Sequence, residues 1–400
     1  MRYVVIGGAG AMGRITVKDL VETCPKGDEI VVADYDFAKA KALAASHKSR
    51  KVLPVRVDVK DRAEAARALA GATVLLNCAP YQLNLHVMEV SLALKCHYVD
   101  LGGLFHMTRR QLELHGRFKK IGRTAVIGMG AAPGITNIMA RLGADKLDSV
   151  TEVHCRVGSM DKTRYEGAPA LPLSYSLKTI LEEFSMRPAV FTKGRMTFVD
   201  PMSGGEPHRF PSPIGVLRPM HTIHSEVATL PYSFRGVREA SFKIAFDPEF
   251  ADRVRFLRDL GMASHDGVEV PSADAHGAVK VAPIDVADKV AMSQKPARQA
   301  GPLRQYEVVR TVVKGRKNGK KATCVVDCRT AGMPSWGIGL DIDTGSPPAV
   351  AAQMLAAGEI TEPGAIPPEK AVPPEPFFKR LKRRGMTVRV SMKSGWGFAV

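Results

Sequence analysis

The chain has 400 residues, of which 45% are hydrophobic and 24% charged, and its formal net charge is +17. This length exceeds what one hydrophobic core usually organises, so we expect a globular protein with two domains. The sequence contains no run of about 18 apolar residues and no signal-peptide pattern. A membrane-spanning helix is therefore excluded, and a cytoplasmic location is expected.

The positive charge could indicate a polyanionic partner, because a dense Lys/Arg surface binds phosphate backbones. The basic residues are spread along the chain, however, and a solvated turn or helix face explains the densest clusters, at 316–321 and 379–384. We therefore expect a small-molecule substrate, with no nucleic acid and no membrane as partner. The six cysteines form no C-x-x-C pair, so free thiols are expected.

The first 130 residues alternate short β-branched runs with helical patterns, which is typical of a parallel sheet covered by helices on both faces. The expected strands are Tyr3–Ile6, Ile30–Ala33, Val52–Val57, Val74–Asn77, His97–Val99 and Ala125–Ile127. Six strands with short crossovers predict a doubly wound α/β domain.

From about 150 to 330 the pattern changes to longer strands with proline-rich connections, which predicts an antiparallel sheet with helices. The expected strands are 150–157, 240–246, 307–313 and 323–328, and Asn318-Gly319 between the last two is a strong hairpin signal. Ser346 followed by Pro347 predicts the start of a helix that ends at Gly358. A proline-rich stretch, 363–376, then leads to a final helix and strand.

A glycine-rich turn follows the first expected strand, with the sequence Gly8-Ala9-Gly10-Ala11-Met12-Gly13. The same turn opens an amphipathic segment, which is the strand-turn-helix setting that diphosphate binding requires. Gly8 permits the tight turn, Gly10 lets the backbone approach the phosphates, and Gly13 lets the helix pack on the strand. The helix N-terminus then offers free N–H groups to a dinucleotide.

The second strand ends at Asp34, 21 residues beyond Gly13. A carboxylate there can accept hydrogen bonds from the adenosine ribose and repels a 2′-phosphate. Because no basic residue follows until Lys39, NAD is favoured over NADP. Further cofactor contacts are expected from four residues that follow later strands: Asp58, Asn77, Ala79 and Pro80.

Several sequence blocks in order resemble the saccharopine dehydrogenase-like family, and within it the lysine 6-dehydrogenases. The blocks are Asn77-Cys78-Ala79-Pro80-Tyr81-Gln82-Leu83-Asn84, His97 to Gly103, Gly128 to Asn137, Thr222 to Pro231, and Thr344 to Gly385. Together they cover nearly the whole chain, and their order is far more specific than the glycine turn.

The resemblance implies a Rossmann domain built from both chain ends, with an inserted α+β domain that carries substrate contacts and often the dimer interface. Residues 1–130, completed by 345–400, would form the NAD-binding domain, and 131–344 the substrate domain. A homodimer or higher homo-oligomer is expected. The changes of pattern near 130 and 345 agree with this division.

One departure bears on the substrate. Where relatives resembling saccharopine reductases have an Asp before the Pro-Gly of the linking block, this chain has Ala132. This favours oxidation of a primary amine, most simply the 6-amino group of L-lysine to allysine, which cyclises to piperideine carboxylate. A saccharopine- or carboxynorspermidine-type opine dehydrogenase is the alternative.

Oxidising an amine with NAD requires a positioned substrate and a base that removes the ammonium proton. Tyr81 and Asp100 follow neighbouring strands, where ligands of open α/β sheets bind, and are the candidate catalytic residues. Asn84 and Asn137 are candidate substrate contacts. Tyr81 could instead only pack, Asp100 could brace the turn that follows it, and Asn137 could be a polar helix residue.

The second domain contains a dense polar group, in which His224, Ser225, Glu226 and Thr229 are candidate substrate contacts. Such a group suits a substrate-lining loop, although a hydrogen-bonded turn would explain it equally. His221 and His224 with Glu226 lack a recognised set of zinc ligands, so no metal is expected. A serine-hydrolase role fails because Ser225 lacks the G-x-S-x-G context.

Three classes of function are compatible with the sequence. An amino-acid dehydrogenase is favoured, a NAD-binding sensor without catalysis is the second, and a nucleic-acid-associated protein is the third. Reduction of NAD in the presence of an amine would distinguish the first class from the others. Strongly salt-dependent binding to duplex DNA would favour the third.

Overall fold

The computed structural model describes residues 1–400 except 168, 174, 273–276, 296 and 395–400. In the described part of the chain, the first domain is a seven-stranded parallel sheet in the order β19-β6-β5-β4-β1-β2-β3. Its strands are β1 (Arg2–Ile6), β2 (Glu29–Asp34), β3 (Val52–Arg56), β4 (Val74–Asn77), β5 (His97–Asp100), β6 (Thr124–Val126) and β19 (Gly364–Ile366). The Rossmann-type fold class expected from the sequence is confirmed.

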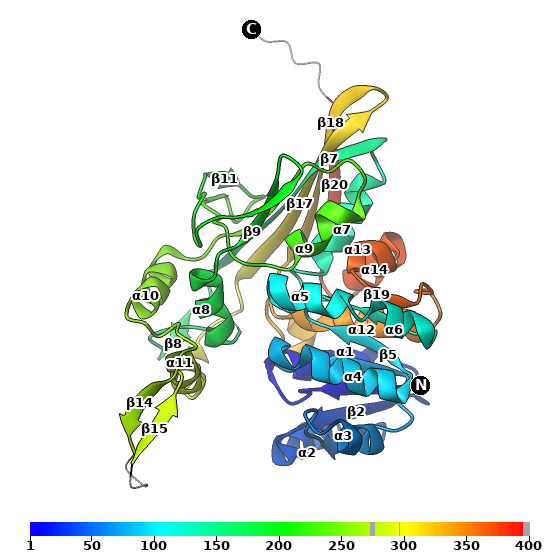
Figure 1. Cartoon of the computed structure of the whole chain (residues 1–400), viewed down its shortest axis with the longest axis vertical. Helices are drawn as coiled ribbons and strands as arrows, with labels where there is room; N and C mark the ends of the chain where they lie inside the picture. Colours follow the sequence, from blue (N-terminus) through cyan, green and yellow to red (C-terminus); the bar gives the residue numbers. More distant parts are fainter. Residues whose placement is uncertain (168, 174, 273–276, 296, 395–400) are drawn as a thin grey trace.

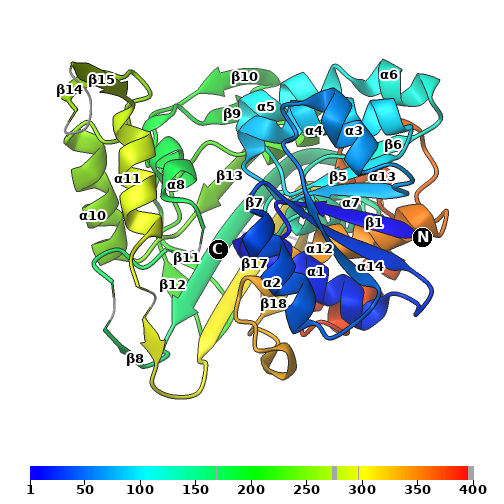
Figure 2. The same ribbon diagram turned by 90° about the horizontal axis from the view of Figure 1, so that it is seen from below.

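Helices cover both faces of this sheet (Figures 1 and 2). They include α1 (Ala11–Thr23), α2 (Phe37–Ser46), α3 (Arg62–Ala68), α4 (Asn84–Leu94), α5 (Leu104–Leu112) and α6 (His115–Lys120). The central strands are buried on both sides, which explains their continuous β-branched runs. Two helices begin at aspartates that accept a backbone N–H, Asp36 for α2 and Asp61 for α3.

The second domain contains a long twisted sheet in the order β10-β9-β13-β7-β17-β18-β20. Its strands are β7 (Ser149–Asp161), β9 (Ala189–Thr192), β10 (Arg195–Phe198), β13 (Glu239–Ile244), β17 (Gln305–Lys317), β18 (Lys320–Thr330) and β20 (Thr387–Ser394). Asn318 and Gly319 both have positive φ and join β17 to β18, as the hairpin signal predicted. The expectation of an antiparallel sheet was wrong in one respect, because β13 pairs with β7 in parallel.

Smaller elements complete the second domain. They are β8 (Tyr165–Glu166), α8 (Leu177–Ser185), β11 (His208–Arg209), β12 (Val216–Leu217), α9 (Glu226–Ser233), α10 (Pro248–Asp259), β14 (Val268–Pro271), β15 (Ala278–Val281), α11 (Pro283–Met292) and β16 (Arg298–Gln299). The β14–β15 pair projects from the body of the molecule, beyond α8, α10 and α11 (Figure 1). Glu226 and Thr229 lie on α9, and not on the loop that the sequence predicted.

The C-terminal residues divide between the two domains. They form η2 (Pro334–Trp336), α12 (Ile342–Ala356), β19, α13 (Pro368–Ala371), α14 (Pro374–Lys382) and β20. α12 lies beside α1 in both views and β19 joins the first sheet, but β20 pairs with β18 in the second sheet. Residues 345–400 were all expected to complete the cofactor domain. This was wrong for β20, which belongs to the second sheet.

The start of α12 also differs from the sequence prediction. The helix begins at Ile342, four residues before Ser346, so Pro347 and Pro348 lie inside it. Gly345 faces α1 so closely that a Cβ would lie 2.5 Å from the Ile15 side chain. The Thr16 hydroxyl of α1 donates to the Gly345 carbonyl at 2.7 Å, which holds the start of α12 against α1.

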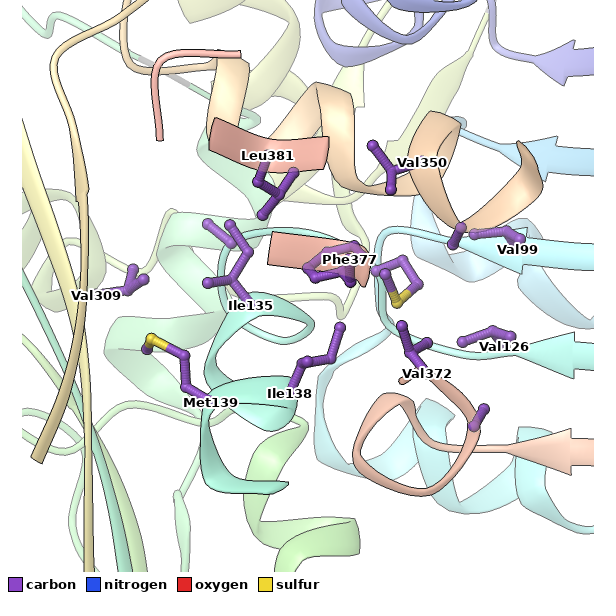
Figure 3. Packing of buried hydrophobic residues seen from close by; sticks show 14 of the residues in the cluster. Val99, Val126, Ile135, Ile138, Met139, Val309, Val350, Val372, Phe377 and Leu381 are labelled. Carbon is purple, nitrogen blue, oxygen red and sulfur yellow. The ribbon is translucent and has the colours of Figure 1, made fainter. Parts of the chain in front are cut away.

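Both domains share one hydrophobic core through α7 (Ile135–Ala144). Figure 3 shows Ile135, Ile138 and Met139 of this helix between Val309 of β17 and Phe377 of α14. Because apolar packing continues from one sheet to the other, the sheets are held in a fixed relation. Among the described residues, no helix is long and apolar enough to span a bilayer.

Candidate functional site

The glycine turn at the carboxyl end of β1 has the shape that a dinucleotide requires. Gly7 has φ +65°, and a Cβ at Gly13 would lie 2.1 Å from the Gly7 carbonyl oxygen. Gly10 is the N-cap of α1 and supplies no side chain to the free N–H groups of the first turn. A side chain would fill this cradle, and the unpaired donors at the helix start suit a diphosphate. Ala11 and Met12, predicted to contact the cofactor, lie in that first turn.

Asp34 lies at the end of β2, beside this turn. Its carboxylate accepts hydrogen bonds from the backbone N–H of Ala9 at 3.1 Å and of Asp36 at 3.0 Å. On the next strand Arg56 pairs with Asp34 in register, and its guanidinium lies 6.0 Å from the centre of the exposed Tyr35 ring. The adenosine end of the site thus contains one carboxylate and one arginine from neighbouring strand ends.

The other predicted cofactor residues follow β3 and β4. Asp58 accepts the Lys60 N–H at 2.9 Å just beyond β3. Asn77 ends β4, where its side-chain oxygen accepts the Ala79 N–H at 3.2 Å. Ala79 also lies against the glycine turn, because a Cβ on Gly7 would be 2.8 Å from its Cα. Ala79 and Pro80 therefore form the wall of the crevice at the end of β4.

Asp100 is buried at the end of β5 and its carboxylate accepts four hydrogen bonds. The donors are the backbone N–H of Gly102 (2.9 Å) and Gly128 (2.6 Å), the Tyr98 hydroxyl (2.8 Å) and the Gln111 side-chain amide. Burial raises the pKa of the Asp100 carboxyl, and these four donors oppose that rise. Both carboxylate oxygens already accept hydrogen bonds from the protein. The geometry therefore favours a structural role, in which Asp100 braces the turn that follows β5, over the role of a base.

Asn84 and Asn137 also lie in buried hydrogen-bond networks. The Asn84 amide bonds Asn77 at 2.8 Å and the Gly102 carbonyl at 3.1 Å. The Asn137 amide nitrogen donates to Thr229 at 3.3 Å and to Glu369 of α13 at 2.9 Å. The Asn84 bonds lie within the first domain, whereas the Asn137 bonds join α7 to α9 and α13; both networks leave little capacity for substrate. Their predicted contacts with substrate find no support in this arrangement.

His224, predicted as a substrate contact, lies between two carboxylates. Its Nδ1 is 2.7 Å from Glu226 Oε2 and its Nε2 is 4.0 Å from Glu183 Oε1, while its ring stacks on Phe242. Burial alone would lower the pKa of His224, but the two carboxylates outweigh it and raise the pKa. Glu226 is fully buried and also accepts the Thr136 hydroxyl, so it positions His224.

Ser225 precedes α9 and meets the first domain. Its hydroxyl accepts a hydrogen bond of 3.0 Å from Thr108 of α5. Thr229, one turn further along α9, lies in the Asn137 network. Both residues are buried, and the bond between Thr108 and Ser225 connects the two domains.

Two glutamates of α8 continue the polar cluster toward the cofactor domain. Glu183 accepts the Tyr175 hydroxyl at 2.8 Å, and burial raises the pKa of its carboxyl to about 7. Glu182 is 1% exposed, with Oε1 3.1 Å from His265 Nε2 and Oε2 without a partner. The Tyr81 hydroxyl of the first domain faces Glu182. Burial raises the pKa of Tyr81, and the Glu182 carboxylate raises it further.

The sequence reading singled out neither glutamate of α8. The helix has apolar residues at 177, 180, 181 and 184, which predicts a buried stripe that excludes positions 182 and 183. Glu182 faces Tyr81 of the first domain, and Glu183 lies against Tyr175 and His224 of the second domain. These contacts join residues that are distant in the chain, so the local pattern of α8 does not predict them. Two residues predicted for the site lie near these glutamates: Tyr81 of the first domain faces Glu182, and His224 lies 4.0 Å from Glu183.

The parallel sheet, the glycine cradle and the polar cluster opposite the strand ends define a dinucleotide-dependent oxidoreductase of the Rossmann class. The family model described as saccharopine dehydrogenase NADP binding domain matches residues 3–126, and the saccharopine dehydrogenase C-terminal domain matches 130–386. The chain belongs to the saccharopine dehydrogenase family and is a nicotinamide-dependent dehydrogenase.

Two curated relatives align over almost their whole length. Carboxyaminopropylagmatine dehydrogenase of Synechocystis sp. is 24% identical, over 96% of each chain. Carboxynorspermidine synthase of Vibrio alginolyticus is 20% identical, over 95% of this chain and 94% of its own. The saccharopine dehydrogenase (L-Glu forming) of Saccharomyces cerevisiae has the same fold, with TM-score 0.72, 17% identity and coverage of 98% and 100%.

Proposed function

We propose that the protein transfers a hydride between a nicotinamide dinucleotide and the CH–NH group of a carboxylated polyamine. The observation that carries this proposal is the unpartnered, buried carboxylate oxygen of Glu182 beside Glu183. Glu182 pairs with His265 and Glu183 lies 4.0 Å from His224, yet two adjacent buried carboxylates stay costly unless a further cation binds them. A protonated amine or a guanidinium supplies that cation.

The names of the two curated relatives support the same class of substrate. They concern carboxylated derivatives of agmatine and of norspermidine, both of which have cationic chains. Oxidation of the 6-amino group of lysine is the second candidate. Ala132, which stands where saccharopine reductases have an Asp, favours it, and the same cluster could hold the lysine ammonium.

The chain's own residues have distinct roles in this proposal. Glu182 holds the cationic group, and Tyr81 borders the crevice at the end of β4. Glu183 accepts the proton of the reacting ammonium. His224, which Glu226 positions, stabilises the negative charge that Glu183 has before it accepts this proton. The nicotinamide, when bound, supplies the hydride acceptor.

A substrate panel tests this function. Cofactor reduction is followed at the NADH band with carboxynorspermidine, carboxyaminopropylagmatine, saccharopine and lysine, each with NAD and with NADP. We expect the two carboxylated polyamines to have the highest kcat/KM. Highest activity with lysine would instead establish the second candidate.

Replacing Glu182 with glutamine should raise KM for the cationic substrate about 10- to 100-fold, the range for one lost charge-assisted hydrogen bond. The turnover number and the cofactor affinity should change little, because Glu182 binds the distal group only. Glu249→Gln, at an exposed carboxylate of α10, is the matched control. An unchanged KM in Glu182→Gln would contradict the assignment.

For the cofactor we propose NAD, because the Asp34 carboxylate repels a 2′-phosphate. The description of the family model and the nearby Arg56 favour NADP instead. Asp34→Ser should reduce the preference for NAD by about tenfold or more, and Arg56→Ala should leave NAD affinity almost unchanged. If the wild-type protein prefers NADP and Arg56→Ala lowers the affinity for NADP, then NADP is the cofactor. Fluorescence titration with both dinucleotides measures this.

A further inference from the structure

Helices α8, α10 and α11 form a lobe of the second domain that has its own hydrophobic core and a strongly apolar surface. Phe184 of α8, Val254 of α10 and Ile284 of α11 pack in that core. Among the described residues, eight of the eighteen exposed large hydrophobic side chains lie between positions 256 and 292. They are Phe256, Leu260, Val268, Val270, Val279, Val286, Val290 and Met292. Single exposed hydrophobic residues are normal, but a concentration of this kind marks an interaction surface.

Strands β14 and β15 form a two-stranded arm that projects from this lobe beyond α11 (Figure 1). Val268 and Val270 lie on the same face of β14, because side chains alternate along a strand. Across the pair they oppose Val281 and Val279, so four valines form this face of the arm. A two-stranded hairpin is at best marginally stable alone in water, and its apolar face contributes stability only when it is covered.

A hollow of about 590 Å³ lies along α10 of the same lobe. Leu171, Phe256 and Leu257 supply its apolar lining. Charged residues of α10 at its rim form ion pairs within the helix. The arm of the same copy lies on the other side of α11 and points away from α10 (Figure 1). One copy of the chain therefore leaves both the apolar face of the arm and the apolar hollow open.

The charge of these elements favours a second copy of the chain as the partner. Residues 262–292, which include the arm, contain five acidic and two basic residues, whereas the whole chain has a net charge of +17. Helix α10 contains three residues of each sign. Two copies repel one another over most of their surfaces, but an acidic arm is attracted to a basic chain and meets no net charge at α10. The same acidity opposes docking of the arm on an anionic membrane or on a nucleic acid.

We propose that two copies of the chain associate through this lobe, with the arm of each seated in the α10 hollow of the other. Each copy supplies one arm and one hollow, so the same contact forms twice about a twofold axis and the assembly closes as a dimer. The valine face of the arm and the apolar lining of the hollow are then covered together.

The arm begins beside the candidate site. His265 lies between α10 and β14, and its Nε2 is 3.1 Å from Glu182 Oε1. The His265 side chain is 54% exposed in one copy, whereas Glu182 is buried. Docking of the arm restrains this loop, so the association holds His265 against Glu182. This consequence rests on the function proposed for Glu182.

Sedimentation of the cofactor-saturated full chain over a range of concentrations tests the association. We expect a dimer in the wild-type protein, and a dissociation constant at least about 100-fold higher in Val279→Asp and in Phe256→Asp, because each change places an unpaired carboxylate in the apolar contact. Val216→Asp, at a similarly exposed valine of β12, is the matched control and should dimerise as the wild type does. All three side chains are exposed in one copy, so each variant should fold, which circular dichroism checks.

A mixture of the two variants tests which surfaces pair. The arm of the Phe256→Asp copy and the hollow of the Val279→Asp copy are both unchanged, so a mixed pair retains one intact contact and should associate more tightly than either variant alone. A monomeric wild-type protein, variants that dimerise unchanged, or a mixture no tighter than the single variants would overturn the proposal.

The link to the site has its own measurement. When dissociated, both variants should have a higher KM for the cationic substrate, with turnover and cofactor affinity unchanged. An unchanged KM in the dissociated variants would remove the link between the dimer and Glu182. Association as expected without oxidation of any carboxylated polyamine would refute the proposed function alone.

Discussion

Replacing Glu183 with glutamine is expected to lower turnover about 100-fold or more, the range for a lost general base. Burial holds the pKa of this carboxyl at about 7, so it can exchange a proton near neutral pH. In the direction of amine oxidation the carboxylate form is required. Wild-type turnover should therefore rise with pH through about 7, and fall over the same range in the reductive direction.

The variant should lose this pH dependence, because glutamine does not titrate there. Tyr175→Phe is the matched control. The Tyr175 hydroxyl lowers the pKa of Glu183, so its removal should shift the rise of turnover with pH to higher pH. Melting temperature and dinucleotide affinity should be preserved in both. A Glu183→Gln enzyme that retains the limb near pH 7 would remove Glu183 from the mechanism.

The strand-turn-helix cradle could be predicted because its signals are local. The strand, the turn and the helix that form the cradle are contiguous from Arg2 to Thr23, so each glycine can be read against its neighbours. The hairpin at Asn318-Gly319 was predicted for the same reason, because the turn type depends on two adjacent residues. The residues that determine a turn lie within that turn, so a short stretch of sequence is enough to predict it.

The C-terminal elements were harder to predict for identifiable reasons. β19 is three residues long and follows Pro363 within a proline-rich stretch, which conceals a strand. Ser346 with Pro347 has the pattern of a helix start, yet packing of Gly345 on α1 extends α12 toward its N-terminus. The pairing of β20 with β18 is non-local, and the sequence of β20 does not state which sheet it joins.

The candidate site depends on contacts between elements far apart in the chain. Tyr81 and Glu182 are separated by about a hundred residues and face one another only after the domains assemble. The burial of Glu182 and Glu183 likewise depends on residues far from α8 in the chain, His265 and His224 among them. The sequence pointed to the strand ends and to His224, which stay predictions, but it could not decide which side chains stay free for a ligand.

Asp100 shows how such a decision changes a prediction. From its position at a strand end it was a candidate base, for which an Asp100→Asn variant would melt normally and lose turnover. The structure shows a carboxylate that accepts four donors, two of them backbone N–H groups. An asparagine would place an NH₂ group against donors on one side of this network.

We therefore expect Asp100→Asn to lose at least about 1 to 3 kcal/mol of unfolding free energy, the cost of leaving one buried donor without an acceptor. Chemical denaturation followed by fluorescence measures the loss. Tyr98→Phe removes only one of the four donors and should cost about 1 kcal/mol. Dinucleotide affinity should fall with the stability of Asp100→Asn, because Gly102 and Gly128 lie in the loops that end β5 and β6. Normal unfolding together with a loss of turnover of about 100-fold would instead return Asp100 to the role of general base.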